Sequence, residues 1–184
     1  MILFRHGQSL FNLHFTQTKR DPGIEDPELT PLGLQQAQDA ADALAAYPIS
    51  HVIVSPYTRA LQTAAPLIAS RGVSVQVTDM VRERFAFSCD IGSSPKALAQ
   101  RFPAHQFDHL PDPWWPGGFE PAEATIARAG QFRRLMAERP DHENILLVSH
   151  WAFILALTGT SVMNGEYISY DPTTKAPEQI IWSH

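Results

Sequence analysis

Residues 1–7 read Met-Ile-Leu-Phe-Arg-His-Gly, and this stretch carries the strongest indication of the fold. The four leading apolar residues predict a short strand that is buried in a sheet. Arg5, His6 and Gly7 predict a loop directly at the carboxyl end of that strand. Residue types suited to catalysis therefore stand at the end of a buried strand, and the following segments indicate what surrounds them.

Strands and helices alternate along the rest of the chain. Helices are predicted after Thr30-Pro31 and Ser55-Pro56, because each pair combines an N-capping residue with proline at the first helical position. We expect the second helix to bend or end near Pro66. Further helices are predicted at residues 121–139 and 151–158. Short apolar runs predict strands at residues 51–54, 73–77, 144–148, 166–170 and 179–182.

This alternation predicts an α/β fold with a mainly parallel central sheet and helices on both faces. A chain of 184 residues is one domain's worth, so residues 1–184 are expected to form a single domain. Residues from about 84 to 120 are rich in proline and aromatic residues and are too few to bury a core of their own. They predict a small lid insertion, with one helix after Ser94-Pro95.

Polar residues follow four of the predicted strands. Arg5-His6 follows the first strand, residues 55–59 follow the second, residues 80–83 follow the third, and Ser149-His150 follows the fourth. Ligands of open α/β sheets bind at the carboxyl ends of the strands. We therefore expect these four groups to meet at one edge of the sheet.

The residue types in these groups fit phosphoryl transfer to a side chain. That reaction needs a nucleophile, positive donors around the phosphoryl oxygens, and a proton for the leaving group. His6 offers an imidazole that is partly neutral at pH 7. Arg5 and Arg59 offer planar guanidinium groups that match two phosphate oxygens. The other candidate phosphate ligands are His150, the backbone at Gly7 and the amide of Asn12.

Residues 3–12, Leu-Phe-Arg-His-Gly-Gln-Ser-Leu-Phe-Asn, resemble the Arg-His-Gly signature of the histidine phosphatase superfamily, also called phosphoglycerate mutase-like. Residues 29–37 resemble the family's Leu-Thr-x-x-Gly-x-x-Gln-Ala helix start. Residues 55–64 resemble the segment that carries its second arginine, and residues 148–150 resemble the strand end at its second histidine. Arg82-Glu83 stands where the family has its acid.

The resemblance implies a metal-independent phosphomonoesterase of the histidine acid phosphatase type, with no cofactor. It implies that His6 accepts the phosphoryl group and that Arg5, Arg59 and His150 form the phosphate pocket. It further implies that Glu83 donates the proton. The partner would be a small phosphorylated metabolite.

Other assignments stay open at this point. Asp90, Glu120 and Glu123 lie in or near the insertion and compete with Glu83 for the acid's role. A metal site built on His6 and His150 is disfavoured, because Arg5 and Arg59 would repel the cation. A catalytically inactive module that only binds a phosphorylated ligand is the alternative from another class of protein.

Hydrolysis is favoured over phosphomutase activity, which remains the alternative reaction. The dipeptide after His150 is Trp151-Ala152, where phosphoglycerate mutases have Gly-Asn, and residues 112–116 lack their Arg-Arg pair. After the acid, Arg84 matches those mutases and Phe85 does not. The expected substrate pocket, which suits a partly apolar alcohol, is lined by Arg84, Phe85, Trp114, Trp115 and Trp151.

The composition restricts the location and the partners. A net charge of −5 provides no general attraction for nucleic acid or an anionic membrane. No signal peptide is evident, the longest apolar stretch is too short to span a bilayer, and a single cysteine cannot form an internal disulfide. We therefore expect a cytoplasmic protein that binds neither nucleic acid nor membrane. Cys89 lacks the Cys-x5-Arg pattern of thiol phosphatases, so a buried, neutral thiol is expected there.

Overall fold

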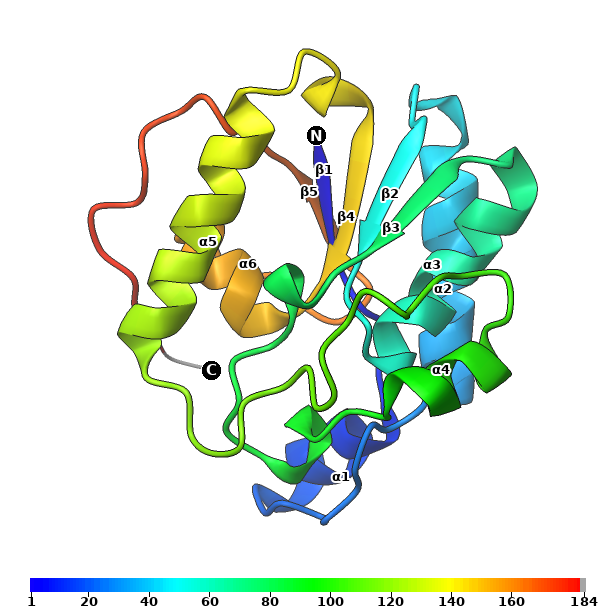
Figure 1. Cartoon of the computed structure of the whole chain (residues 1–184), viewed down its shortest axis with the longest axis vertical. Helices are drawn as coiled ribbons and strands as arrows, with labels where there is room; N and C mark the ends of the chain where they lie inside the picture. The colour runs from blue at the N-terminus through cyan, green and yellow to red at the C-terminus, as the bar shows by residue number, and fades with distance from the viewer. Residues whose placement is uncertain (183–184) are drawn as a thin grey trace.

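A computed structural model describes residues 1–182. A five-stranded sheet forms its centre (Figure 1), in the spatial order β3-β2-β4-β1-β5. The first four strands are parallel, and β5 pairs with β1 in the antiparallel direction. This confirms the predicted α/β fold with its mainly parallel sheet. The strands are β1 (Ile2–Arg5), β2 (His51–Val54), β3 (Ser74–Val77), β4 (Ile145–Ser149) and β5 (Tyr167–Ser169).

Helices cover both faces of the sheet. Figure 1 shows α2 and α3 on one side of it and α5 and α6 on the other. The helix α1 lies beyond the carboxyl ends of the parallel strands, with α4 nearby. The bounds are α1 (Leu10–Thr18), α2 (Pro31–Ala43), α3 (Thr58–Arg71), α4 (Pro95–Arg101), α5 (Ala122–Ala137) and α6 (Trp151–Thr158).

The two halves of the core follow from the alternation of side chains along each strand. Leu146 and Val148 of β4 pack on the side of α2 and α3. Ile145 and Leu147, which alternate with them along the strand, face the other side of the sheet and pack with Phe153 of α6 and with α5. All five residues of β4 are buried because helices cover both faces, and such a strand is a continuous apolar run rather than an alternating one.

The helix α3 differs from its prediction at its start, and it does not end at Pro66. It begins at Thr58 rather than after an N-cap at Ser55, and it runs through Pro66 to Arg71. Asp26, a residue from a distant loop, accepts hydrogen bonds from the backbone N–H of Thr58 at 2.9 Å and from its hydroxyl at 2.7 Å. Because the capping group is far away in the sequence, local patterns do not reveal where this helix starts.

One helix was not predicted, and one predicted strand was wrong. Residues 10–18 form α1, a helix for which no prediction was made from the sequence. The Ser9 hydroxyl caps the helix by accepting from the backbone N–H of Asn12, and Oδ1 of Asn12 accepts in turn from the backbone N–H of Ser9. Residues 179–182 form no strand, and Ile180 and Trp182 instead pack against the core beside α5 and α6.

The chain between β3 and α5 contains α4 and two short 3-10 helices, Asp79–Val81 and Ser88–Asp90. Ser94 caps α4 by accepting from the backbone N–H of Ala97, as the Ser94-Pro95 pair predicted. This segment passes the carboxyl ends of the strands (Figure 1). Within residues 1–182, no helix has the length and apolar character needed to cross a bilayer.

Candidate active site

The register of the sheet brings the predicted groups together. Arg5 pairs with Ser149 across β1 and β4, so the following residues, His6 and His150, leave the sheet at the same level. The two imidazole rings lie with their centroids 5.0 Å apart. The hydroxyl of Ser149 donates to the carbonyl oxygen of Val81 at 2.7 Å, which ties the segment before Glu83 to the same edge.

His6 is held as a neutral imidazole, and only one of its two ring nitrogens is hydrogen-bonded within residues 1–182. The ring is buried, and Nδ1 lies 2.7 Å from the carbonyl oxygen of Gly7. A carbonyl oxygen can only accept, so Nδ1 carries the proton and Nε2 keeps its lone pair. Burial, and then the charges of Arg59 and Arg5, lower the pKa of His6 well below its ordinary value. At neutral pH the ring is therefore in the form that a nucleophile requires.

Two guanidinium groups reach this site from different elements. Arg5 ends β1, and its Nη1 donates to the carbonyl oxygen of Val162 at 2.8 Å. Burial lowers the pKa of Arg5 to about 10, so the side chain remains charged at neutral pH. Arg59, in the first turn of α3, is 2% exposed and is bonded to residues 89–90. Both charges act on His6, where a transferred phosphoryl group would develop negative charge.

His150 is the more deeply buried of the two histidines. Its Nε2 lies 2.7 Å from Oγ of Ser55, the residue that follows β2. Burial, followed by the charges of Arg59, His6 and Arg5, lowers the pKa of His150 well below its ordinary value. Its Nδ1 has no hydrogen-bond partner among residues 1–182.

Glu83 has the properties of a general acid. Its Oε1 accepts hydrogen bonds from the backbone N–H of Arg84 at 2.8 Å and of Ala152 at 3.0 Å. Ala152 lies in the first turn of α6, directly after the His150 segment, so the acid is tied to the second histidine. Burial, and then the negative charge of Asp90, raise the pKa of Glu83 to about 7. A carboxyl group tuned to this range can donate a proton at neutral pH.

The rival carboxylates have other partners or positions. Glu120 is buried and accepts from Arg82 at 3.2 Å and from Arg128 at 3.0 Å. Glu123 is exposed in the first turn of α5. Asp90 forms a buried ion pair with an arginine of the site. Glu83, in contrast, forms no salt bridge with any residue that the structure describes.

Gly7 serves a close contact between two backbone segments. A Cβ atom at Gly7 would lie 2.5 Å from the carbonyl oxygen of Gly33, in the first turn of α2. The backbone N–H of Gly7 donates to Oγ1 of Thr63 at 3.1 Å. The lack of a side chain at position 7 is therefore needed for packing against α2, and this requirement is separate from the predicted contact of its backbone with phosphate.

Asn12 belongs to a polar network around His6. Its Oδ1 accepts from the Ser9 hydroxyl at 2.9 Å and from Nδ2 of Asn164 at 3.2 Å. The same Nδ2 donates to the backbone carbonyl of His6 at 3.1 Å. Asn164 was not among the predicted residues, and it lies 158 positions from His6, so only the fold relates the two.

Three of the proposed pocket residues are close in sequence to Glu83 or to its hydrogen-bond partner Ala152. The guanidinium of Arg84 stacks on the ring of Phe119 at 4.9 Å and on that of Trp182 at 5.1 Å. Its Nε donates to the backbone carbonyl of Glu120. Phe85 is partly exposed, and Trp151 donates from Nε1 to the Ser161 hydroxyl at 2.9 Å.

The other two proposed pocket residues pack inside the protein. Trp114 is 3% exposed, and its ring meets that of Tyr57 edge-on with centroids 4.6 Å apart. Its Nε1 donates to the backbone carbonyl of Ser93 at 2.9 Å. Trp115 is partly buried against Trp114. The structure thus places Trp114 in the core on the α2 and α3 side of the sheet, with Trp115 packed against that core.

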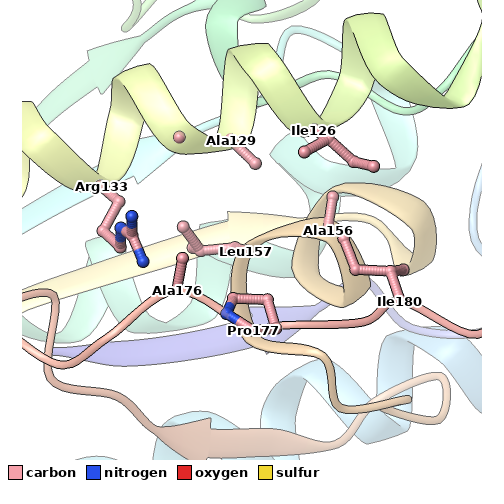
Figure 2. Close-up of a pocket in the computed structure, with 9 residues that line it drawn as sticks. Ile126, Ala129, Arg133, Ala156, Leu157, Ala176, Pro177 and Ile180 are labelled. Carbon is pink, nitrogen blue, oxygen red and sulfur yellow. The ribbon is translucent and has the colours of Figure 1, made fainter.

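A cavity of about 150 Å³ lies between α5, α6 and the C-terminal segment (Figure 2). It contains no candidate site residue, so it is separate from the histidine site. Arg133 points into it among apolar side chains. The other lining residues are Ile126, Ala129, Gly130, Ala156, Leu157, Ala176, Pro177 and Ile180.

The α/β fold and this cluster of two histidines and two arginines are typical of enzymes that act on phosphate esters. Comparison with known families agrees, since residues 1–168 match the model of the histidine phosphatase superfamily, branch 1. The chain belongs to that superfamily. It is therefore an enzyme that acts on phosphate esters.

Similar proteins include both phosphomutases and phosphatases. A 2,3-bisphosphoglycerate-dependent phosphoglycerate mutase of Cytophaga hutchinsonii is 27% identical over 167 residues, covering 85% of this chain and 74% of the relative. A probable phosphatase of Schizosaccharomyces pombe is 28% identical over 141 residues, covering 73% and 64%. Phosphoserine phosphatase of Entamoeba histolytica, solved with 3-phosphoglyceric acid, superposes with a TM-score of 0.53 at 27% identity, covering 84% and 75%.

Proposed function

We propose that this protein is a phosphatase that hydrolyses a small phosphomonoester through a phosphohistidine on His6. The observation that carries the proposal is the state of the His6 ring. It is a neutral imidazole whose Nδ1 donates to the Gly7 carbonyl, and burial, followed by the charges of Arg59 and Arg5, lowers its pKa. Such a ring is poised to attack phosphorus through Nε2 while the arginines stabilise the phosphoryl oxygens.

In the first step, Nε2 of His6 forms a bond to phosphorus as the bond to the ester oxygen breaks. Glu83, protonated because its pKa is raised to about 7, transfers its proton to the departing alkoxide. The guanidinium groups of Arg5 and Arg59, with His150 as a further donor, balance the charge on the equatorial oxygens. The alcohol leaves and Glu83 remains as a carboxylate.

In the second step, the Glu83 carboxylate takes a proton from a water molecule whose oxygen attacks phosphorus. The bond between Nε2 of His6 and phosphorus breaks, inorganic phosphate is released, and Glu83 is again protonated. The two steps use the same carboxyl group first as acid and then as base, which requires a pKa near the working pH. The value of about 7 supports this dual role.

Rapid quenching with a labelled substrate tests the intermediate. Wild-type protein should yield an acid-labile, base-stable phosphoenzyme, and His6→Ala should yield none. Gln8→Ala is a suitable control, because Gln8 is the second residue after His6 and its side chain accepts from Thr30. Label retained by His6→Ala would exclude the mechanism, and the absence of turnover with any phosphomonoester would favour the inactive binding module.

Hydrolysis is the preferred reaction because the second anionic end of a phosphoglycerate has few cations to bind. Arg82 and Arg84 flank Glu83 in the sequence. Arg82 and the nearby Arg128 are paired with Glu120, and Arg84 is already hydrogen-bonded to the Glu120 carbonyl and stacked on two aromatic rings. We therefore expect little interconversion of 3- and 2-phosphoglycerate. Rapid interconversion in a coupled assay would instead favour the phosphomutase alternative, which the Cytophaga hutchinsonii relative represents.

We propose a partly apolar or aromatic alcohol portion for the substrate. Aromatic rings from α1 and from the insertion contact one another: Phe11 stacks on Phe15 at 5.3 Å, and Phe87 meets Phe15 at 5.1 Å. Phe87 is 41% exposed and lies three residues before Asp90, the partner of Arg59. Apolar area removed from water contributes about 25 cal/mol per Å², so one ring face is worth about 1–2 kcal/mol.

The substrate class is tested with phenyl phosphate and 3-phosphoglycerate. We expect a higher kcat/KM for phenyl phosphate, and Phe87→Ala should raise its KM about tenfold. Tyr47→Ala is a matched control, because Tyr47 is similarly exposed but precedes β2 at the opposite end of the sheet. A clear preference for 3-phosphoglycerate would contradict the proposed pocket.

We further propose that residues 84–120 act as a lid over the site, within a single domain. Phe85, Phe87 and Phe119 of this segment are at least partly exposed, which supports a role in covering a substrate. The free, buried thiol of Cys89 fits a reducing compartment, and the cytoplasm is the proposed location.

A further inference from the structure

Asp90 is a buried carboxylate that is hydrogen-bonded through both of its oxygens. Its side chain is 2% exposed, and Oδ1 lies 3.3 Å from Nη2 of Arg59. Its Oδ2 accepts from the backbone N–H groups of Ala86 and Phe87, each at 3.0 Å. A buried charge is costly unless it is paired and hydrogen-bonded, and Asp90 meets both conditions.

The 3-10 helix Ser88–Asp90 holds the Arg59 guanidinium from several directions. Nη1 of Arg59 donates to the Cys89 carbonyl at 2.7 Å, and the guanidinium lies 4.2 Å above the ring of Tyr57. The hydroxyl of Tyr57 donates to the backbone carbonyl of Asp90 at 2.5 Å, which closes the arrangement. The Cys89 and Asp90 oxygens use two of the five N–H donors of Arg59, and the other three make no hydrogen bond within residues 1–182, which leaves them for a phosphoryl group.

This inference rests on the proposed function. We propose that Asp90 is a positioning residue for phosphoryl transfer, which holds the Arg59 guanidinium at the His6 site by a buried ion pair and places a negative charge near the protonated acid Glu83. Both effects come from one carboxylate. The ion pair orients the donor of the phosphate pocket. The like charge favours the protonated form of Glu83.

The charged groups around Glu83 show how Asp90 helps to keep the Glu83 carboxyl group protonated. Arg59 and Arg5 favour the carboxylate, and Asp90 is the anion that opposes them. Arg128 is a third cation that interacts with Glu83. The thiol of Cys89 and the phenol of Tyr57 also face Glu83, and burial raises the pKa of both, so they are neutral at neutral pH. Without Asp90 the cations would dominate and Glu83 would release its proton at lower pH.

The test uses Asp90→Asn in the full chain, with orthovanadate as the probe of the phosphate pocket. Asparagine retains the shape of the side chain but loses the charge. We expect the inhibition constant for orthovanadate to rise about tenfold. We also expect the basic limb of kcat/KM for an alkyl phosphate to move at least about half a unit toward lower pH.

Glu120→Gln is the matched control. Glu120 is also a buried carboxylate in the insertion, paired with Arg82 and Arg128, but it forms no hydrogen bond or ion pair with Arg59 or Glu83 among the residues that the structure describes. Its loss should lower the melting temperature while leaving the basic limb and the vanadate constant in place. A merely structural role for Asp90 would give the same result as this control.

Asp90→Glu tests the inference if Asp90→Asn does not fold. Glutamate keeps the charge and displaces it by one methylene, so the basic limb should stay in place while the vanadate constant rises about threefold or more. An unchanged vanadate constant in this variant, or tighter vanadate binding in Asp90→Asn, would overturn the inference. Tighter binding would mean that the Asp90 carboxylate competes with phosphate for the Arg59 guanidinium.

The phosphoenzyme measurement separates this inference from the proposed function. If wild-type protein forms no phosphohistidine, the proposed function fails whatever the Asp90 variants do. If the phosphohistidine forms on His6 and Asp90→Asn retains the wild-type vanadate constant and basic limb, only the role of Asp90 is refuted.

Discussion

Replacing the acid with Glu83→Gln should separate substrates by how much their leaving group needs a proton. Glutamine can accept from the backbone N–H groups of Arg84 and Ala152 as Glu83 does, so the fold should be retained. General acid catalysis contributes about 10²- to 10⁴-fold. We therefore expect kcat for an alkyl phosphate to fall by at least about 100-fold. The first step with p-nitrophenyl phosphate should change far less, because its phenolate leaves without a proton.

The pH dependence of the wild-type enzyme follows from the same carboxyl group. Glu83 must be protonated in the first step, and its pKa is raised to about 7, so kcat/KM for an alkyl phosphate should fall as the pH rises through 7. At pH 8 about one tenth of the plateau value should remain. The pKa of His6 is lowered well below 6.5, so the acidic limb, where the nucleophile becomes protonated, should lie well below that pH.

Stopped-flow and steady-state assays with both substrates across pH 4–9 measure these effects. Burst kinetics with p-nitrophenyl phosphate isolate the first step from hydrolysis of the phosphoenzyme, in which Glu83 acts as base. Equal losses of the first step with both substrates, or no loss with either, would refute the assignment of Glu83. A basic limb that survives in Glu83→Gln would assign the titration to another group.

Four further predictions concern stability, reactivity and metal dependence. Gly33→Ala should destabilise the fold and reduce activity, because a Cβ atom there would lie 2.1 Å from the backbone oxygen of Gln8; the melting temperature and kcat report both effects. Phe153→Ala should cost about 3–5 kcal/mol in urea unfolding, because its ring is fully buried between α5 and the sheet. Cys89 should resist iodoacetamide at pH 8 until the protein is unfolded, because burial raises the pKa of its thiol. Activity should survive EDTA, since two arginines supply the positive charge; loss on chelation, with recovery on adding a divalent ion, would favour a metal site.

Local patterns in the sequence predicted the helices and strands whose bounds depend on residues within the element itself. The strand at residues 51–54 was predicted with its observed bounds, because a β-branched run flanked by polar residues needs no distant partner to be recognised. The starts of α2 and α4 followed from Thr30-Pro31 and Ser94-Pro95, where the capping hydroxyl lies within the same turn. The start of α3 was wrong because its cap is supplied by Asp26.

The residue types of the site and their order along the chain follow from the sequence alone. Arg5-His6, Arg59, Glu83 and Ser149-His150 each follow a predicted strand, and in a parallel sheet the carboxyl ends of all strands lie at one edge. This is why the pattern of strands and helices was sufficient to predict that the four segments meet. The register of β1 with β4 then set the two histidine rings 5.0 Å apart.

The electrostatic state of these groups, in contrast, is a property of the folded molecule. Burial lowers the pKa of His6 and raises that of Glu83, and no motif specifies how deeply a side chain is buried. The partners of Arg59 and His6 are also distant in the sequence: Asp90 lies 31 positions from Arg59, and Asn164 lies 158 positions from His6. The free energy of ionising a side chain depends on every charged or polar neighbour within several ångströms, and those neighbours come together only when the chain folds.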